Sequence, residues 1–159
     1  GMGCAYALAV HPADKNILFA GGGEVVSGGE TFALFKSTDG GSGWVRTGLT
    51  GSGSIRSIVF DSRNAMRMYL GTSLGVYSST DGGENWQKPA SSFYIYCLLS
   101  DPDTGLKVWA GTGSGVSVTT DGGLTWSDAG SVAAAFFVFT GGLVRLCETL
   151  RTDDTGVRS

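Results

Sequence analysis

Three aspartates recur within one short phrase, and their carboxylates are the groups in this sequence that could most readily do chemistry. The phrase reads STDGGSGW at 37–44, STDGGENW at 79–86 and TTDGGLTW at 119–126. A carboxylate beside a hydroxyl could serve as a general acid or base, or as a calcium ligand. Two glycines follow each aspartate, however, and they supply the positive φ that a tight turn needs. The carboxylate can then accept hydrogen bonds from backbone N–H groups two residues further on.

The number of copies decides between the catalytic and the structural interpretation. Three equivalent carboxylates that are spread over three repeats cannot converge on one substrate. We therefore interpret the phrase as a clamp for a turn, and we expect no metal and no cofactor. The structural positions are Ser37, Asp39, Gly41, Trp44, Ser79, Asp81, Gly83, Trp86, Thr119, Asp121, Gly123 and Trp126.

The phrase belongs to a longer repeat. Its successive aspartates are 42 and 40 residues apart. Upstream of them, the segments YALAVHP, RSIVFDS and YCLLSDP occupy the same position in their respective repeats. Each repeat reads as four short β-branched and aromatic segments that Gly, Asp and Pro separate. A repeated four-stranded antiparallel unit predicts an all-β fold, the blades of a β-propeller. An unrelated β-sandwich is the alternative, but it does not explain why the repeats align without gaps.

The spacing sets the expected extent of each blade within a single partial propeller. Blade one is predicted at 3–46, blade two at 53–88, blade three at 92–128 and an incomplete blade four at 131–159, about three and a half blades in all. In this register VAAAFFVF is a first strand, and Arg151 and Thr152 fall in the second-strand slot. A rival register treats Thr152, Asp154 and Gly156 as a degenerate copy of the phrase, but it requires a deletion of seven residues. Since such a set cannot close a ring, we expect a fragment with exposed strand edges that self-associates.

Composition excludes several classes of protein. The net charge of −3 gives no electrostatic case for nucleic acid or for an anionic membrane surface. No apolar run approaches the roughly 18 residues of a membrane span, and no signal peptide is predicted in this segment. Cys4, Cys97 and Cys147 show no metal-ligand spacing, and we predict that they are small buried residues.

The pattern S/T-x-D-x-G-x-x-W resembles the Asp-box, or BNR, repeat, and the resemblance covers about three units of the chain. Such repeats occur in bacterial sialidases, sortilin-type receptors, xyloglucan-cleaving propeller hydrolases and photosystem II assembly-factor-type propellers. The resemblance implies a propeller and an extracellular or periplasmic location. It does not imply one function, because the same blade serves enzymes, receptors and assembly factors.

Candidate site residues lie where the copies of the repeat differ. The first repeat has 18 residues from Gly21 to Asp39 where the others have 10, and the extra residues include Glu24 and Glu30. An insertion in one repeat often maps to a binding face, so we predict these two as ligand-binding residues. The alternative is an inert surface hairpin in which EVV pairs with ETF.

A second candidate comes from the resemblance alone. RTDDTGV at 151–157 is similar to the R-T-D-x-G-G segment of xyloglucan-cleaving propellers, which implies Asp153 as a catalytic candidate and Arg151 as a ligand-binding one. Glycoside hydrolysis needs two carboxylates, and the sequence shows no partner for this one. We therefore predict a non-catalytic binding segment for a glycan or a protein. The alternative is a fragment of a secreted glycoside hydrolase, sialidase-like or xyloglucanase-like.

Overall fold

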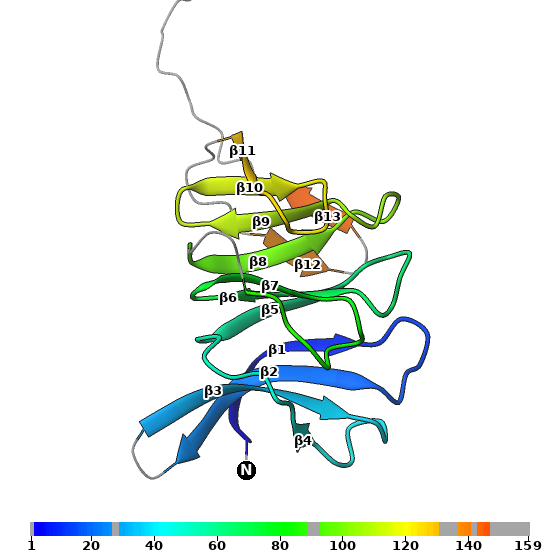
Figure 1. Cartoon of the computed structure of the whole chain (residues 1–159), viewed down its shortest axis with the longest axis vertical. Coiled ribbons are helices and arrows are strands. Elements are labelled where there is room, and N and C mark those ends of the chain that lie inside the picture. Colours follow the sequence, from blue (N-terminus) through cyan, green and yellow to red (C-terminus); the bar gives the residue numbers. More distant parts are fainter. Residues whose placement is uncertain (1, 27–28, 89–92, 131–136, 141–142, 147–159) are drawn as a thin grey trace, which may run out of the picture.

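The computed structural model describes residues 2–26, 29–88, 93–130, 137–140 and 143–146, and every regular element within them is a β-strand (Figure 1). Blade one is the sheet of β1 (Met2–Val10), β2 (Leu18–Val26), β3 (Gly29–Ser37) and β4 (Val45–Arg46). Blade two is the sheet of β5 (Ile55–Phe60), β6 (Met68–Thr72) and β7 (Gly75–Ser79). Blade three is the sheet of β8 (Ile95–Ser100), β9 (Val108–Thr112), β10 (Gly115–Thr119) and β11 (Ser127–Gly130).

All pairings within the blades are antiparallel, and each strand pairs with its neighbour in sequence. In blade two a bridge between Ser78 and Gln87 stands in the place of a fourth strand. The expected all-β fold of antiparallel propeller blades, incomplete as a ring, is confirmed.

Beyond blade three, β12 (Phe137–Thr140) pairs with β13 (Leu143–Leu146). The repeat spacing instead put the second strand of this segment near Arg151 and Thr152, which lie outside the described residues. The reason is local, because a Gly–Gly pair at 141–142 separates two apolar runs and favours a two-residue hairpin.

The core lies between successive blades. Side chains alternate between the two faces of each strand. One face of blade one, with Phe19 and Leu34, packs on Ile58 and Leu70 of blade two. Blades two and three meet in the same way, through a second cluster made of Tyr69, Val76, Ile95, Leu98, Val108 and Ala110. Each blade therefore covers one face of the next.

Blade one shows what an uncovered face looks like. Leu8, Ile58 and Leu98 are equivalent, since they pair with Ala20, Leu70 and Ala110 respectively. Ile58 is 7% exposed and Leu98 is 1% exposed, but Leu8 is 62% exposed. No described blade stands against that face. Cys4 is exposed and Cys97 is only partly buried, although we predicted that both are buried.

The Asp-box turns are closed by a repeated set of hydrogen bonds. The Asp81 carboxylate accepts the Ser79 hydroxyl at 2.8 Å and the backbone N–H of Asn85 at 2.9 Å. Ser79 Oγ in turn accepts the N–H of Gly83 at 2.9 Å. The backbone donors to the carboxylate lie three and four residues on, not two, because positive φ at both glycines widens the turn. Equivalent bonds close the turns of blades one and three.

These hydrogen bonds predict that the protein is less stable at acidic pH. Chiefly because the N–H of Asn85 stabilises the ionised form, the pKa of Asp81 is lowered from 3.8 to about 2, and donors likewise lower the pKa of Asp39 and Asp121. A carboxyl group whose pKa is lower in the folded than in the unfolded protein stabilises the fold at pH values above its unfolded-state pKa. This stabilisation is lost as the pH falls through the folded-state pKa. We expect the Tm, followed by circular dichroism, to be constant above about pH 5 and to fall between about pH 4 and pH 2.

Asp81→Asn is the control for this prediction. It keeps an oxygen acceptor for the backbone donors but cannot ionise, so its Tm should fall less steeply in the same pH range. Equal slopes in the two proteins would show that the Asp81 carboxylate does not contribute to the acid response.

Candidate functional site

The two ends of the blade stack carry different residues. One end, here the box end, holds the Asp-box turns and the turns between first and second strands, which bond to each other through pairs such as Gly82 N–H to Met66 O at 2.8 Å. The other, the loop end, holds the β2–β3, β6–β7 and β9–β10 connections (Figure 1). Nine acidic side chains are described, and all but Asp128 on β11 belong to box-end turns: Asp14, Asp39, Asp61, Asp81, Glu84, Asp101, Asp103 and Asp121.

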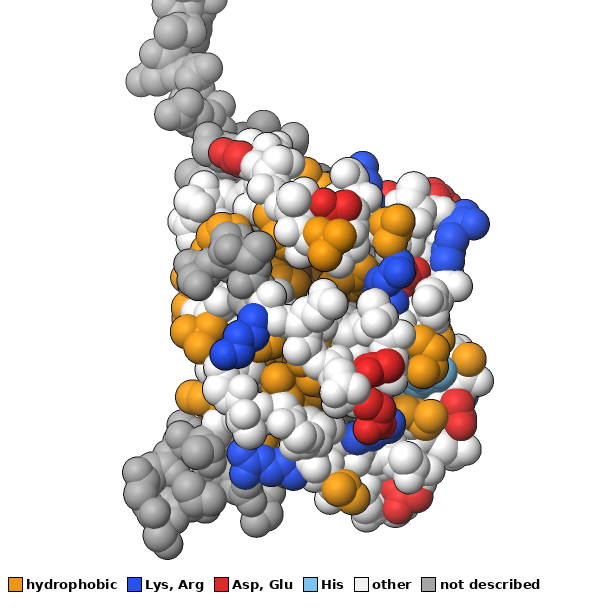
Figure 2. Space-filling view, viewed as in Figure 1, with side chains coloured by type: hydrophobic (Ala, Val, Ile, Leu, Met, Phe, Trp, Pro, Cys, Tyr) orange, Lys and Arg blue, Asp and Glu red, His pale blue; other side chains and the backbone are white. Residues whose placement is uncertain are grey.

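Figure 2 shows one face of the molecule. Acidic side chains lie toward the right and the top, and basic and hydrophobic ones lie on both sides, including the left edge, which is the loop end. A ligand that approaches the loop end therefore meets cations and apolar groups among the described residues.

A bulge at the same position in each blade presents one large side chain toward solvent. The register of β1 on β2 shifts between Ala5 and Ala7, which leaves Tyr6 as the extra residue. The same shift isolates Arg56 in β5 and Tyr96 in β8. A β-bulge leaves its extra residue unpaired and can re-aim the side chain. All three side chains are exposed, Tyr6 at 47% and Tyr96 at 54%.

The first strands of successive blades bring these residues into one row. β5 contacts both β1 and β8. The N–H of Leu98 in β8 donates to Ser57 Oγ in β5 at 3.0 Å. The Arg56 guanidinium carbon lies 5.9 Å from the ring centre of Tyr6 and 5.2 Å from that of Tyr94. The Tyr94 and Tyr96 rings follow, with centres 4.9 Å apart. We call Tyr6, Arg56, Tyr94 and Tyr96 the Tyr–Arg row.

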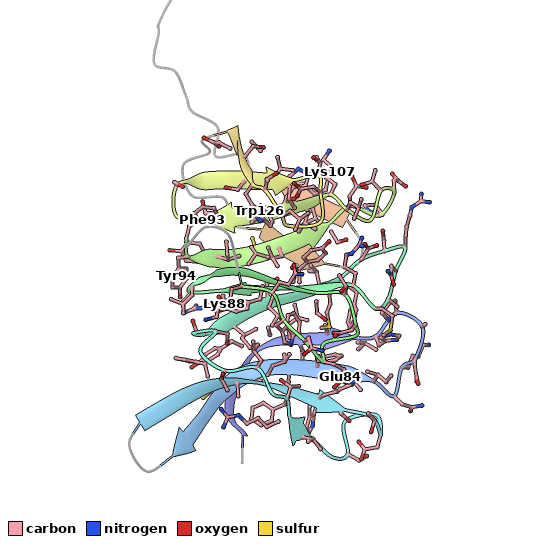
Figure 3. All side chains as sticks on the ribbon, in the orientation of Figure 1. Glu84, Lys88, Phe93, Tyr94, Lys107 and Trp126 are labelled. Atoms are coloured by element: carbon pink, nitrogen blue, oxygen red, sulfur yellow. The ribbon has the colours of Figure 1, made fainter. Side chains whose placement is uncertain are left out.

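The row opens on the loop end. Figure 3 places Tyr94, Phe93 and Lys88 toward that end, and Glu84 and Lys107 toward the box end. Phe93 packs on the core between blades two and three, which anchors the segment that carries Tyr94. The row is thus backed by buried structure and faces outward.

Arg56 differs from other basic residues in what surrounds it. Arg67 lies 3.2 Å from the Asp61 carboxylate, and Lys36 lies 2.9 Å from Glu84. Within the described chain no carboxylate lies within ion-pair distance of Arg56, whose guanidinium lies over two tyrosine rings. A guanidinium that contacts aromatic rings through its face keeps its N–H edge available for a further acceptor.

The side chains of the ligand-binding and catalytic residues predicted from sequence are not among those that the structure describes. The backbone at Glu24 pairs with Thr31 and that at Glu30 pairs with Val25, so the insertion in blade one forms a hairpin in which EVV pairs with ETF. The side chains of Glu24 and Glu30 are outside the description, as are Arg151 and Asp153. Ligand binding by the first two and Arg151, and catalysis by Asp153, therefore stay predictions.

Sequence reasoning missed the Tyr–Arg row. A signal was present, since the position two residues before Leu8, Ile58 and Leu98 holds a large residue in every repeat. Among the residues that the structure describes, there is no cluster of three His, Cys, Asp or Glu side chains that could hold a metal, and no helix that could cross a membrane.

Comparisons with known proteins point to one architecture. No protein-family model matches the chain, and no curated protein does. Among solved structures, an ancestral GH74 enzyme shares 27% identity over 79% of this chain and 18% of its own, with a TM-score of 0.64. The GH74 xyloglucanase from Xanthomonas campestris shares 21% identity over 82% of this chain and 24% of its own, with a TM-score of 0.67.

A third solved structure is similar over the same part of the chain. YCF48 from Cyanidioschyzon merolae shares 19% identity over 77% of this chain and 36% of its own, with a TM-score of 0.54. The chain therefore spans about a fifth to a third of the length of these proteins. The GH74 enzymes and YCF48 share the blade architecture, so the likeness supports the fold. Any activity of this chain must be argued from its candidate site.

Proposed function

We propose that this chain, which is part of an Asp-box β-propeller, is a non-catalytic binding segment that holds a glycan on the Tyr–Arg row. The observation that carries the proposal is the repeated bulge, which places Tyr6, Arg56 and Tyr96 at one position in three successive blades. Exposed aromatic faces bind the apolar C–H faces of pyranose rings, because this contact removes apolar surface from water. A row that spans three blades suits an extended oligosaccharide better than a single sugar.

The likeness to secreted-type glycoside hydrolases supports an extracellular or periplasmic location, where such glycans occur. The same likeness favours a second candidate function, glycoside hydrolysis, with this chain as a fragment of the enzyme. That function requires two carboxylates at the bound sugar, and no described carboxylate lies near the row. Asp153 alone would not supply both.

The test measures binding of soluble polysaccharides to the purified chain by isothermal titration calorimetry. Light scattering first determines the oligomeric state, because the exposed Leu8 and Val10 of blade one favour self-association. We expect Tyr94→Ala to weaken binding by roughly tenfold, which is about 1.4 kcal/mol and in the range of a binding hot spot. The panel contains xyloglucan, mannan and polygalacturonate.

Leu124→Ala is the matched control, since Leu124 is 65% exposed on the box turn of blade three, at the opposite end. It should leave the affinity unchanged. Equal losses in the two variants, or no binding of any polysaccharide, would contradict the proposal. Release of reducing sugar from the bound polysaccharide would instead support the hydrolase.

A further inference from the structure

The position of Arg56 carries information about the glycan beyond its general class. Arg56 lies inside the Tyr–Arg row, between Tyr6 at 5.9 Å and Tyr94 at 5.2 Å, and it is exposed. A cation beside aromatic rings is attracted by their π faces without being neutralised. The row therefore presents a fixed positive charge at its centre.

No described group compensates this charge. Eight of the nine described acidic side chains lie in box-end turns, and the ninth, Asp128, lies on β11 of blade three, whereas Arg56 is on β5 of blade two. Lys88 is exposed in the segment that leads to β8, toward the same end as Tyr94 (Figure 3). Arg56 and Lys88 are thus the charged side chains described around the row, although the whole chain has a net charge of −3.

The geometry of a guanidinium selects among anions. Its planar edge offers paired N–H donors that match the two oxygens of a carboxylate. Because the guanidinium carbon of Arg56 lies over the rings of Tyr6 and Tyr94, these rings restrict the positions that the guanidinium can take before a ligand arrives. Fixing a donor in advance lowers the entropy that binding must otherwise lose.

From these observations, and resting on the proposed function, we propose that the Tyr–Arg row binds a carboxylate-bearing glycan, a polyuronate, in which a tyrosine stacks on the sugar ring and Arg56 pairs with the carboxylate of a uronic acid. The aromatic residues supply affinity for any pyranose. Arg56 supplies the preference for the acidic sugar.

The experiment compares two ligands with the same sugar backbone, polygalacturonate and its methyl ester, in which the carboxylate is replaced by a neutral ester. Calorimetry at two salt concentrations is run on the whole chain. We expect the chain to bind the acid at least about tenfold more tightly than the ester, and we expect this preference to shrink at high salt.

Two variants of one residue separate charge from geometry. Arg56→Gln should lose the preference for the acid and keep the affinity for the ester. Arg56→Lys, which keeps the charge but loses the planar fork, should show an intermediate preference. Lys107→Gln is the control, since Lys107 lies over the Trp109 ring at 4.5 Å on the box end and should change neither affinity.

The outcomes are distinguishable. Equal binding of acid and ester by the unmodified chain would overturn the inference while leaving glycan binding in place. A preference for dextran sulfate over polygalacturonate, tested in parallel, would overturn the choice of carboxylate. Failure of both galacturonate polymers and of the neutral polysaccharides would overturn the proposed function as well.

Discussion

A Leu98→Ala variant is expected to lose about 2–5 kcal/mol of its free energy of unfolding, whereas Leu8→Ala should change this free energy by less than about 0.5 kcal/mol. The two leucines occupy the same position in their blades, opposite Ala110 and Ala20. Leu98 is 1% exposed in the core between blades two and three, while Leu8 is 62% exposed. The substitution is chemically identical, so the difference measures what a neighbouring blade contributes.

Urea unfolding followed by tryptophan fluorescence gives both free energies. Leu8→Ala is the built-in control, since it removes the same atoms from the same kind of strand. Similar losses in the two variants would mean that the face of blade one is covered in solution. Light scattering at the same concentrations would then show whether a second copy covers it.

Gly71→Ala is expected to destabilise the protein by about 1–3 kcal/mol through overpacking between blades two and three. A Cβ at this position would lie 2.6 Å from Ile95 Cγ2 and 3.1 Å from Leu98 Cγ. Ile95 is fully buried and its branched Cβ is stiff, so the neighbour cannot move aside. Gly21 makes the equivalent approach to Ile55, which is why a glycine recurs in the second strand.

Two further proteins test that explanation. Gly48→Ala should be neutral or slightly stabilising, because a Cβ there meets no atom within 4 Å. In an Ile95→Leu background, which removes Cγ2, Gly71→Ala should destabilise less than it does alone. Additive losses, with no coupling between positions 71 and 95, would contradict the packing explanation.

The fold could be predicted because its signals are local and repeated. The Asp-Gly-Gly turns, the apolar runs and the even spacing each appear three times, so an ambiguous strand in one repeat is resolved by the others. The segment after 130 has only one copy of its signal, and its Gly–Gly pair outweighed the spacing. Where a segment has no second copy, its own turn residues are a better guide to its structure than the spacing of the repeat.

The candidate site was less predictable for a physical reason. Tyr6, Arg56 and Tyr94 lie far apart in sequence and are brought together by the contacts between first strands and by the bulge in each. A bulge reverses which side of the strand a residue faces, and periodicity alone does not reveal it. Sequence reasoning looked instead for insertions and family motifs, and so it selected Glu24, Glu30, Arg151 and Asp153.

The stacked arrangement of cores has a consequence for how the protein loses its structure. Since each blade buries apolar surface only against its immediate neighbours, the total stability is close to a sum of intrinsic blade terms and nearest-neighbour coupling terms, as in a one-dimensional lattice. Among the described blades, blade two is coupled on both sides, and blade one on one side only. Unfolding of the blades is therefore not fully cooperative. Because blade one has fewer coupling terms, it opens before blade two, and its amide hydrogens exchange with solvent first.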